Sequence, residues 1–523
     1  MSMIPENLRL SNHYTVFIYP FFYNIREKNR DSWIRSLARS WDPWWSRLGN
    51  EIGSALDNTY FFLPYIREVL FPETAIFKDK PPGKDYENWI NEIVRWNKGG
   101  LSCFCQELSP NAVLRATYKQ TYLQQLKQFE VVERADTQTS TTSIAARIDW
   151  IDAVLFPSGI GFLMLKIVLD RDSPQLNHLV DLNYSLRLVH PPNTAWILPE
   201  IRFGGQAHKN TVRDLMDFLT QAMVSEVEQI DNFAAWKATV SDSKQIRLSE
   251  TESGQVYGER CNIFSYACVN VEENELGRSS TGVFDSLKDR LVFEYASSIE
   301  IGDSVNNTLW TPSTEQVQRL KTDHQISVWK AWTGMALKES VVFLGTEDIS
   351  FNRNLLPANV ENDYLPLYVY TLYQKYQLFI FADQLMRKGA YVAEHLNEVR
   401  VLMDRFMDFR NKYWFNEVTR KPLGGELYTK FQRGLESISL FDLVTLQVKD
   451  LKEYYEERRQ RRIDVVLNVF TFLFIPIGAA IGVFGMTFFE GSWMAFIITM
   501  VIILTISVGI WRWWTGEFGP HIE

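Results

Sequence analysis

The sequence predicts an α/β (or α+β) cytosolic domain, followed by a long stalk helix and two C-terminal transmembrane helices. Three observations lead to this fold class. Short apolar runs of the buried-strand type are mixed with helical stretches before residue 360. A helical pattern without proline runs from Gly424 to Ile475 and leads into the first of two long uncharged runs. We divide the chain into an N-terminal added subdomain (1–145), an α/β domain (146–360), long helices with the stalk (361–462) and a transmembrane module (463–515).

The composition excludes two classes of protein. The 523 residues are 46% hydrophobic and 22% charged, and a transporter with many spans would be far more apolar. The net charge of −9 argues against a nucleic-acid partner, which would favour a basic surface. The N-terminus has no basic region followed by an apolar run, so we expect no signal peptide. The four cysteines match no zinc spacing and are expected to be reduced thiols: Cys103, Cys105, Cys261 and Cys268.

Apolar runs and turn residues place the elements of the α/β domain. Pro157-Ser158-Gly159 separates two strand candidates and predicts a hairpin between them. The tryptophan-rich segment before residue 50 is expected to form core or interface. The candidate strands are His13–Pro20, Ile148–Phe156, Gly161–Leu169 and Ile263–Val269, and the candidate helices are Val212–Val224 and Gln316–Leu337.

No motif indicates an enzyme. The sequence has no HExxH, no GxSxG and no paired metal-ligand motif, so we predict no catalytic activity and no cofactor. The loop Gly204–Thr211 precedes a helix, and its amides with Lys209 could cradle an anion. Its spacing is not that of a Walker motif, and we interpret it as a loop with a helix cap.

The region before the membrane module is predicted to be helical. Tyr364–Tyr413 is one long or two broken helices, and Pro422 with Gly424-Gly425 marks a turn. From there to Ile475 we predict a single helix of about fifty residues, about 75 Å long. Its acidic side chains could form cation sites between protomers, but the interspersed bases favour a solvated face; these acids are Asp442, Asp450, Glu453, Glu456 and Glu457.

Two uncharged runs, Val465–Phe484 and Trp493–Trp511, are each long enough for a bilayer core. The short segment between them predicts a tight hairpin. Four arginines between Arg458 and Arg462 precede the first run and predict a cytoplasmic side by the positive-inside rule. We therefore predict a multi-pass protein of the cell (inner) membrane, with both termini cytoplasmic and the lipid bilayer as a partner.

Two helices cannot enclose a pore, so conduction requires a homo-oligomer. One face of the first run carries its polar side chains and glycines, which makes it the candidate pore lining. Gly478 and Gly482 equally form a small-xxx-small motif for helix packing. The predicted pore-lining residues are Asp464, Asn468, Thr471, Ile475, Gly478 and Gly482.

The first run ends in Val483-Phe484-Gly485-Met486-Thr487-Phe488. Together with Phe409–Thr419 and Gly424–Leu427, this segment resembles the CorA family of magnesium and divalent-cation transporters. The resemblance implies a homopentamer with a central pore, an outer-mouth signature and magnesium as the transported ion. Gly485 and Met486 match the signature, and Thr487 stands where the family has asparagine. Glu490, in the loop, would attract cations, or is a solvated acid. No other metal ligands are predicted.

Three functions remain open at this point. The first is a divalent metal cation channel or transporter of the CorA type, gated through the cytosolic domain. The alternative is a ligand-gated CorA-like membrane effector of a defence system, which would respond to a nucleotide signal. Thr487 and the large N-terminal region favour the alternative. A membrane-tethered scaffold that does not conduct is the third.

Overall fold

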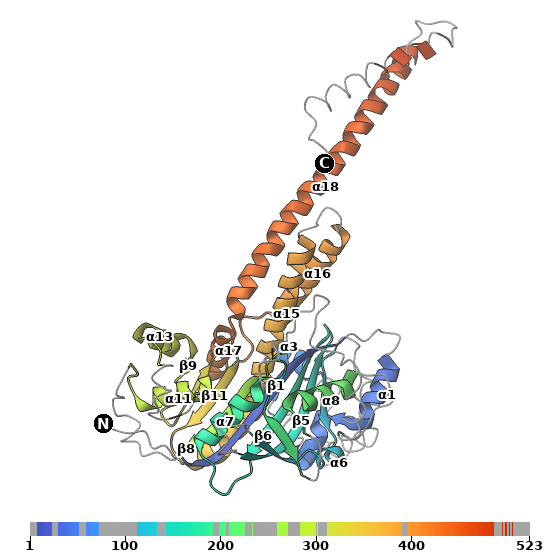
Figure 1. The fold of residues 1–523 in the computed structure, drawn as a ribbon. Helices are drawn as coiled ribbons and strands as arrows, with labels where there is room; N and C mark the ends of the chain where they lie inside the picture. Colours follow the sequence, from blue (N-terminus) through green and yellow to red (C-terminus); the bar gives the residue numbers. More distant parts are fainter. Residues whose placement is uncertain are drawn as a thin grey trace, which may run out of the picture. The chain divides into compact units, whose positions relative to one another are not determined.

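The computed structural model describes most of the first 485 residues and a few residues after them (Figure 1). The described residues are 8–23, 30–51, 59–72, 112–132, 143–191, 198–204, 209–224, 233, 259–269, 283–299, 301, 311–389, 396–485, 494, 497–498, 501–502 and 505. The chain forms two compact units, one of residues 1–381 with 408–441 and one of 382–407 with 442–523.

The first unit is built on one mixed sheet, whose described strands run in the order β2-β3-β5-β6-β1-β8-β11-β10-β9, with β4 between β5 and β7. Most neighbours are antiparallel, and β8 and β11 are parallel. The strands are β1 Leu10–Phe22, β2 Trp41–Pro43, β3 Leu114–Tyr118, β4 Gln128–Val132, β5 Ser143–Phe156, β6 Ile160–Leu169, β7 Glu200–Phe203, β8 Asn262–Val269, β9 Gln325–Ile326, β10 Trp332–Ala336 and β11 Ser340–Gly345.

The four predicted strands are all present. β5 and β6 form the predicted antiparallel hairpin, and Gly159 in its turn has φ +90°, a conformation that suits glycine. The predicted run from His13 is β1, which lies between β6 and β8 in the middle of the sheet. Its central residues Val16, Phe17 and Ile18 are at most 1% exposed. The N-terminal residues therefore contribute a core strand to the same sheet as residues 143–345.

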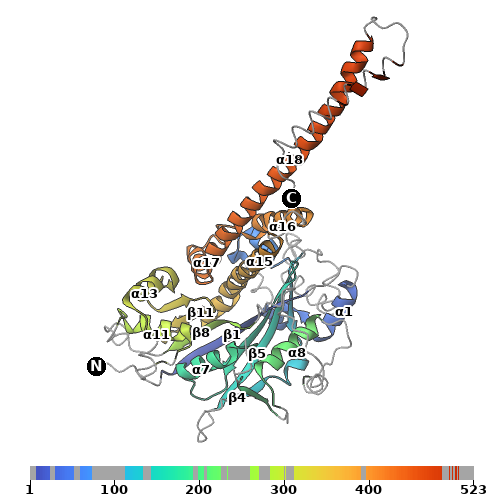
Figure 2. The same ribbon diagram turned by 45° about the horizontal axis from the view of Figure 1, so that its top comes forward.

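Helices cover both faces of this sheet. On one face, Thr15 of β1 contacts Asn183 of α7 and Ser265 of β8 contacts Tyr295 of α11. On the opposite face, Phe264 of β8 stacks on Tyr368 of α15, 5.6 Å between ring centroids. Figure 2 shows α7 and the first part of α15 on the two sides of the sheet. The described helices and helical turns are α1 Arg30–Ser40, η2 Trp44–Glu51, η3 Thr59–Phe61, α3 Pro64–Leu70, α6 Gln120–Leu123, α7 Leu176–Arg187, α8 Val212–Val224, α11 Leu287–Ser297, α13 Thr314–Arg319, η4 Leu320–His324, η5 Phe351–Leu355, α14 Leu356–Asn359, η6 Val360–Tyr364, α15 Leu365–Gly389, α16 Leu396–Tyr413, α17 Pro422–Gly434 and α18 Ser437–Gly485.

Two helix predictions are corrected. The stretch 316–337 is not one helix: α13 and η4 end at His324, and β9 and β10 follow. The residues after His324 enter the sheet instead of extending the helix, because β9 pairs with β10 and β10 pairs with β11. The stalk is interrupted at Leu435 and Glu436, so α17 and α18 are separate helices. The break is a left-handed residue, Glu436, with φ +57°.

The predicted transmembrane module is also corrected. Within the part of the chain that the structure describes, no helix is both long and apolar enough to cross a bilayer. Val465–Phe484 is not a separate span but the end of the 49-residue α18, whose first half carries many charged side chains. Most of Trp493–Trp511 lies outside the described residues. The two transmembrane helices and the multi-pass placement in the membrane with its cytoplasmic termini were therefore wrong predictions.

Candidate ligand-binding site

Lys375, on α15, is a lysine buried in the interior of the first unit. Lys375 is the only charged residue between Leu365 and Ala382, and the sheet buries this part of α15. The residue is 6% exposed, and its Nζ donates a hydrogen bond to the carbonyl oxygen of Lys338, 3.2 Å away. Among the described residues, no carboxylate pairs with this ammonium group. A buried cation without a counter-ion is costly, so the surroundings of Lys375 are the natural place to look for a ligand.

Lys375 borders an open pocket of about 420 Å³. One wall is the start of β8 with the residues before it, a second is the turn between β10 and β11, and a third is α15. Three cationic side chains converge here from these three walls. The lining residues are Glu259, Arg260, Cys261, Asn262, Lys338, Glu339, Lys375, Tyr376 and Phe379.

The cations of the pocket differ in how well they are balanced. Arg260 pairs with Glu339 at 2.9 Å, and Lys338 pairs with Glu436 at 2.8 Å. Burial and, to a smaller extent, the nearby Lys338 lower the pKa of Lys375 to about 8, although Glu339 and Glu436 act in the opposite direction. Lys375 is thus the cation whose charge the protein itself compensates least.

The other titratable groups of the pocket are unsuited to chemistry. Burial raises the pKa of the Cys261 thiol, so it stays protonated and is a poor nucleophile. Burial also raises the pKa of Tyr376, whose hydroxyl accepts a hydrogen bond from the Asn262 amide at 3.3 Å. Neither Cys261 nor Tyr376 is therefore activated as a base or a nucleophile.

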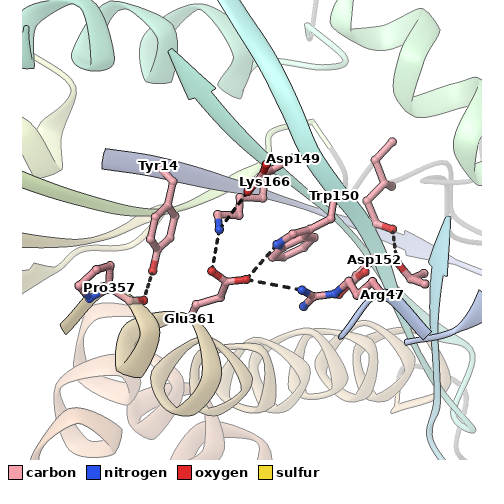
Figure 3. Close-up of polar contacts among 10 residues, drawn as sticks. Tyr14, Arg47, Asp149, Trp150, Asp152, Lys166, Pro357 and Glu361 are labelled. Carbon is pink, nitrogen blue, oxygen red and sulfur yellow. Dashed lines mark hydrogen bonds and ion pairs between the residues drawn. The ribbon is translucent and has the colours of Figure 1, made fainter. Parts of the chain in front are cut away.

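A second charged cluster fixes the beginning of α15 (Figure 3). Glu361, in the turn before this helix, accepts hydrogen bonds from Lys166 Nζ at 2.7 Å and from Trp150 Nε1 at 2.9 Å. Arg47 lies 3.6 Å from the same carboxylate, donates to Asp152 at 3.0 Å and stacks over the Trp150 ring. The charged side chains of these four elements therefore pair with one another; they are Arg47 of η2, Asp152 of β5, Lys166 of β6 and Glu361 of η6.

The neighbouring Tyr14 and the small cavity support a structural role for this cluster. Tyr14 Oη donates to the carbonyl oxygen of Pro357 at 2.9 Å, which ties β1 to α14. The cavity beside Asp152 has a volume of about 40 Å³, enough for a few water molecules. Burial raises the pKa of Asp152, and Arg47 opposes this. We conclude that the cluster anchors the sheet to the segment that leads into α15, and so positions Lys375.

The residues predicted to line a pore all lie on α18, on one face of the helix. Asp464 accepts a hydrogen bond from Gln460, and Thr471 donates to the carbonyl oxygen of Leu467, one turn back in each case. Ile475 is 63% exposed, and beyond the backbone of α18 itself no atom of the described residues comes within 4 Å of a Cβ built on Gly478 or Gly482. Their role in a pore stays a prediction, as does that of Asn468. Gly485 is the last residue of α18, and Met486, Thr487 and Glu490 lie outside the described residues.

Three of the five acids predicted on the stalk pair with bases of the same helix. Glu453, Glu456 and Glu457 each lie within 4 Å of a lysine or arginine one turn away on α18. This favours the solvated face over cation sites between protomers. In the described residues, no group of three or more histidine, cysteine or acidic side chains is arranged to hold a metal ion.

Sequence analysis missed the pocket, although one signal pointed to it. A lone lysine inside a long aromatic and aliphatic helix pattern is a charge that must find a partner. Arg260 and Lys338 carry no such signal, because they come from distant parts of the chain. The loop before Val212 is the predicted helix cap: Thr211 N donates to the Asp214 carboxylate at 2.8 Å, and Asp214 N points back to Thr211 Oγ1 at 3.4 Å.

Comparisons with known proteins leave the family open. No protein-family model and no curated protein matches this chain. Among solved structures, the chain is similar to one described as "structure of the full-length CmaX protein", with 14% sequence identity and a TM-score of 0.19. The similarity covers 48% of this chain and 88% of that one. A likeness at this level does not establish a shared family or function, and the CorA resemblance stays a prediction from the sequence.

Proposed function

We propose that this chain is a ligand-responsive protein, without enzymatic activity, that binds a small anionic ligand of the nucleotide class in the pocket beside α15. The observation that carries this proposal is the Lys375 ammonium group, which is buried without a carboxylate partner among the described residues. An anion bound in the pocket supplies the missing negative charge. It gains a charge-assisted hydrogen bond from a donor that is already held in place by Lys338.

The other walls of the pocket narrow the class of ligand. Arg260 and Lys338 add two further cations, which suits a phosphate or another multiply charged group. Tyr376 and Phe379 add aromatic surface, which suits a planar ring. The Asn262 side chain on β8 adds an amide, which donates a hydrogen bond to the Tyr376 hydroxyl. A volume of about 420 Å³ is in the ordinary range for small-molecule sites. A nucleotide combines these features, which agrees with the alternative function inferred from the sequence.

Binding of ADP, pyrophosphate and adenosine to the full chain tests the proposal by calorimetry and by thermal unfolding. We expect ADP and pyrophosphate to bind and to raise the unfolding temperature, and adenosine, which has no anionic group, to have no effect. Lys375→Met should weaken ADP binding by about tenfold or more, because it removes the central charge.

Lys288→Met is the matched control. Lys288 is half-buried and, like Lys375, donates to a backbone carbonyl, that of Lys330 at 2.9 Å, but it does not line the pocket. Its replacement should leave ADP affinity unchanged. If neither ADP nor pyrophosphate binds, or if both variants bind like the unchanged protein, the proposed function is wrong.

Transport of divalent cations is a weaker candidate. It rests on the CorA resemblance around Gly485, Met486 and Thr487, and the described residues provide no membrane-crossing helix for it. Magnesium as a substrate and a homopentamer as the assembly stay predictions of that resemblance. Uptake of Mg²⁺ by liposomes that contain the purified chain tests this function, and uptake no greater than that of empty liposomes would exclude it.

A further inference from the structure

Lys338 takes part in two sets of contacts at once. It lies in the turn between β10 and β11, and its side chain lines the pocket. Its carbonyl oxygen accepts the hydrogen bond from Lys375, while its own ammonium group pairs with Glu436 at 2.8 Å. The Lys338 and Glu436 side chains are both more than half exposed, so this pair can separate at low cost.

Glu436 occupies a strained position. Its φ of +57° is left-handed, a conformation that costs about 1 kcal/mol or more for a residue other than glycine. Leu435 and Glu436 separate α17 from α18 in a sequence that predicts one continuous helix. The Glu436 N–H donates to the Arg433 carbonyl, and the Glu436 carbonyl accepts from Leu440 at 3.2 Å. The ion pair with Lys338 is the contact that holds its side chain.

The α17 side of this junction is fixed by other contacts. Gly434 approaches the β10 strand so closely that a Cβ would lie 2.6 Å from the Ala336 carbonyl oxygen. Lys430 donates to the Thr322 carbonyl at 2.6 Å, and Arg433 pairs with Asp323 at 3.2 Å. Loss of the Lys338 contact would therefore act on Glu436 and the start of α18 rather than on α17.

We propose that an anion bound in the pocket competes with Glu436 for the Lys338 ammonium group, so that ligand binding loosens the junction between α17 and α18. This inference rests on the anion-binding function proposed above. It makes Lys338 a positioning residue for the junction as well as a ligand contact. By linkage, whatever weakens the pair of Lys338 with Glu436 must strengthen ligand binding by the same factor.

Affinity for ADP, measured by calorimetry on the full chain, tests the competition. Glu436→Gln frees Lys338 and should tighten ADP binding about twofold to fivefold, the range expected for an exposed ion pair. Glu436→Asp keeps the negative charge but shortens the side chain, and it should tighten binding as well. Asp323→Asn removes an acid of the same region that pairs with Arg433 instead, and it should leave the affinity unchanged. Tightening by Glu436→Gln alone would indicate a general charge effect and overturn the inference.

Hydrogen exchange at residues 431–441 tests the loosening. Saturating ADP should speed exchange of the Leu435 and Glu436 amides about threefold or more in the unchanged protein. In Glu436→Gln, exchange should already be fast, and ADP should add nothing. If ADP binds in a manner that depends on Lys375 but leaves this exchange unchanged, the inference fails and the proposed function stands. If ADP and pyrophosphate do not bind, both fail.

Discussion

The two charged clusters beside α15, around Glu361 and around Lys375, both bury charged side chains but differ in whether these charges are paired. Around Glu361, each buried acid faces a base, and the cavity beside Asp152 measures only about 40 Å³. Around Lys375, a buried base faces an open pocket with no carboxylate partner among the described residues. The first arrangement is what a structural anchor requires, and the second leaves a charge that a ligand can neutralise. The comparison teaches that pairing, rather than burial, separates the two roles.

The largest expected effect tests the anchor. Glu361→Gln removes the charge that faces both Lys166 and Arg47, so that each cation keeps one carboxylate partner, Asp149 for Lys166 and Asp152 for Arg47. We expect the free energy of unfolding to fall by about 3 kcal/mol, the lower part of the range for a broken buried pair, because Glu361 is partly exposed. Urea denaturation measures this. Glu436→Gln is the control and should cost less than about 1 kcal/mol, since its pair is exposed. Equal losses in the two variants would mean that the cluster is not an anchor.

At Lys375 we expect a substitution to raise the free energy of unfolding instead of lowering it. Burial lowers its pKa from 10.5 to about 8, and a tenfold change in proton affinity corresponds to about 1.4 kcal/mol. Lys375→Met removes a charge that the ligand-free protein pays to bury, so the variant should be more stable by about 2 kcal/mol at pH 7. Urea denaturation without ligand measures this gain. A variant less stable than the unchanged protein would show that Lys375 is compensated in a way that the pocket geometry does not reveal.

The stability gain of Lys375→Met should depend on pH, which distinguishes Lys375 further from the paired charges around Glu361. In the folded protein Lys375 loses its proton near pH 8, and in the unfolded chain near 10.5. Between these values the unfolded state binds more protons, so the stability contributed by this residue rises with pH. The advantage of Lys375→Met should therefore shrink above pH 8, by up to about 1.4 kcal/mol per pH unit. Over the same window, ADP binding to the unchanged protein should weaken, because the anion loses its partner. An advantage that stays constant between about pH 7 and 10 would contradict this.

Local sequence patterns predicted several strands of the sheet, but features that depend on contacts between distant residues were not predicted. The runs that became β1, β5, β6 and β8 are apolar enough to be recognised by themselves. The break at Glu436 could not be read from its neighbours, because the contacts beside it come from Lys338 and from Ala336 against Gly434. The pocket was missed for the same reason, since Arg260, Lys338 and Lys375 meet only after folding. The uncharged run Val465–Phe484 also led to the wrong prediction of a membrane span, because it forms the end of a helix whose first half carries many charges.

The smallest expected change in the free energy of unfolding concerns Asp363, an acid next to the Glu361 cluster that is less well paired than the acids of the cluster. Asp363, two residues after Glu361, is buried, and its Oδ1 has no hydrogen-bond partner in the described part of the chain. Burial raises its pKa to about 6, and Lys421, 3.8 Å away, opposes this only in part. Between about pH 4 and 6 the folded state therefore binds more protons than the unfolded state, and the stability contributed by this residue falls as pH rises. Asp363→Asn should gain about 1 kcal/mol at pH 7 and nothing below about pH 4, as measured by urea denaturation. A loss at pH 7 would instead mean that the pair with Lys421 outweighs the cost of burial, and Asp363 would then belong with the paired charges of the anchor.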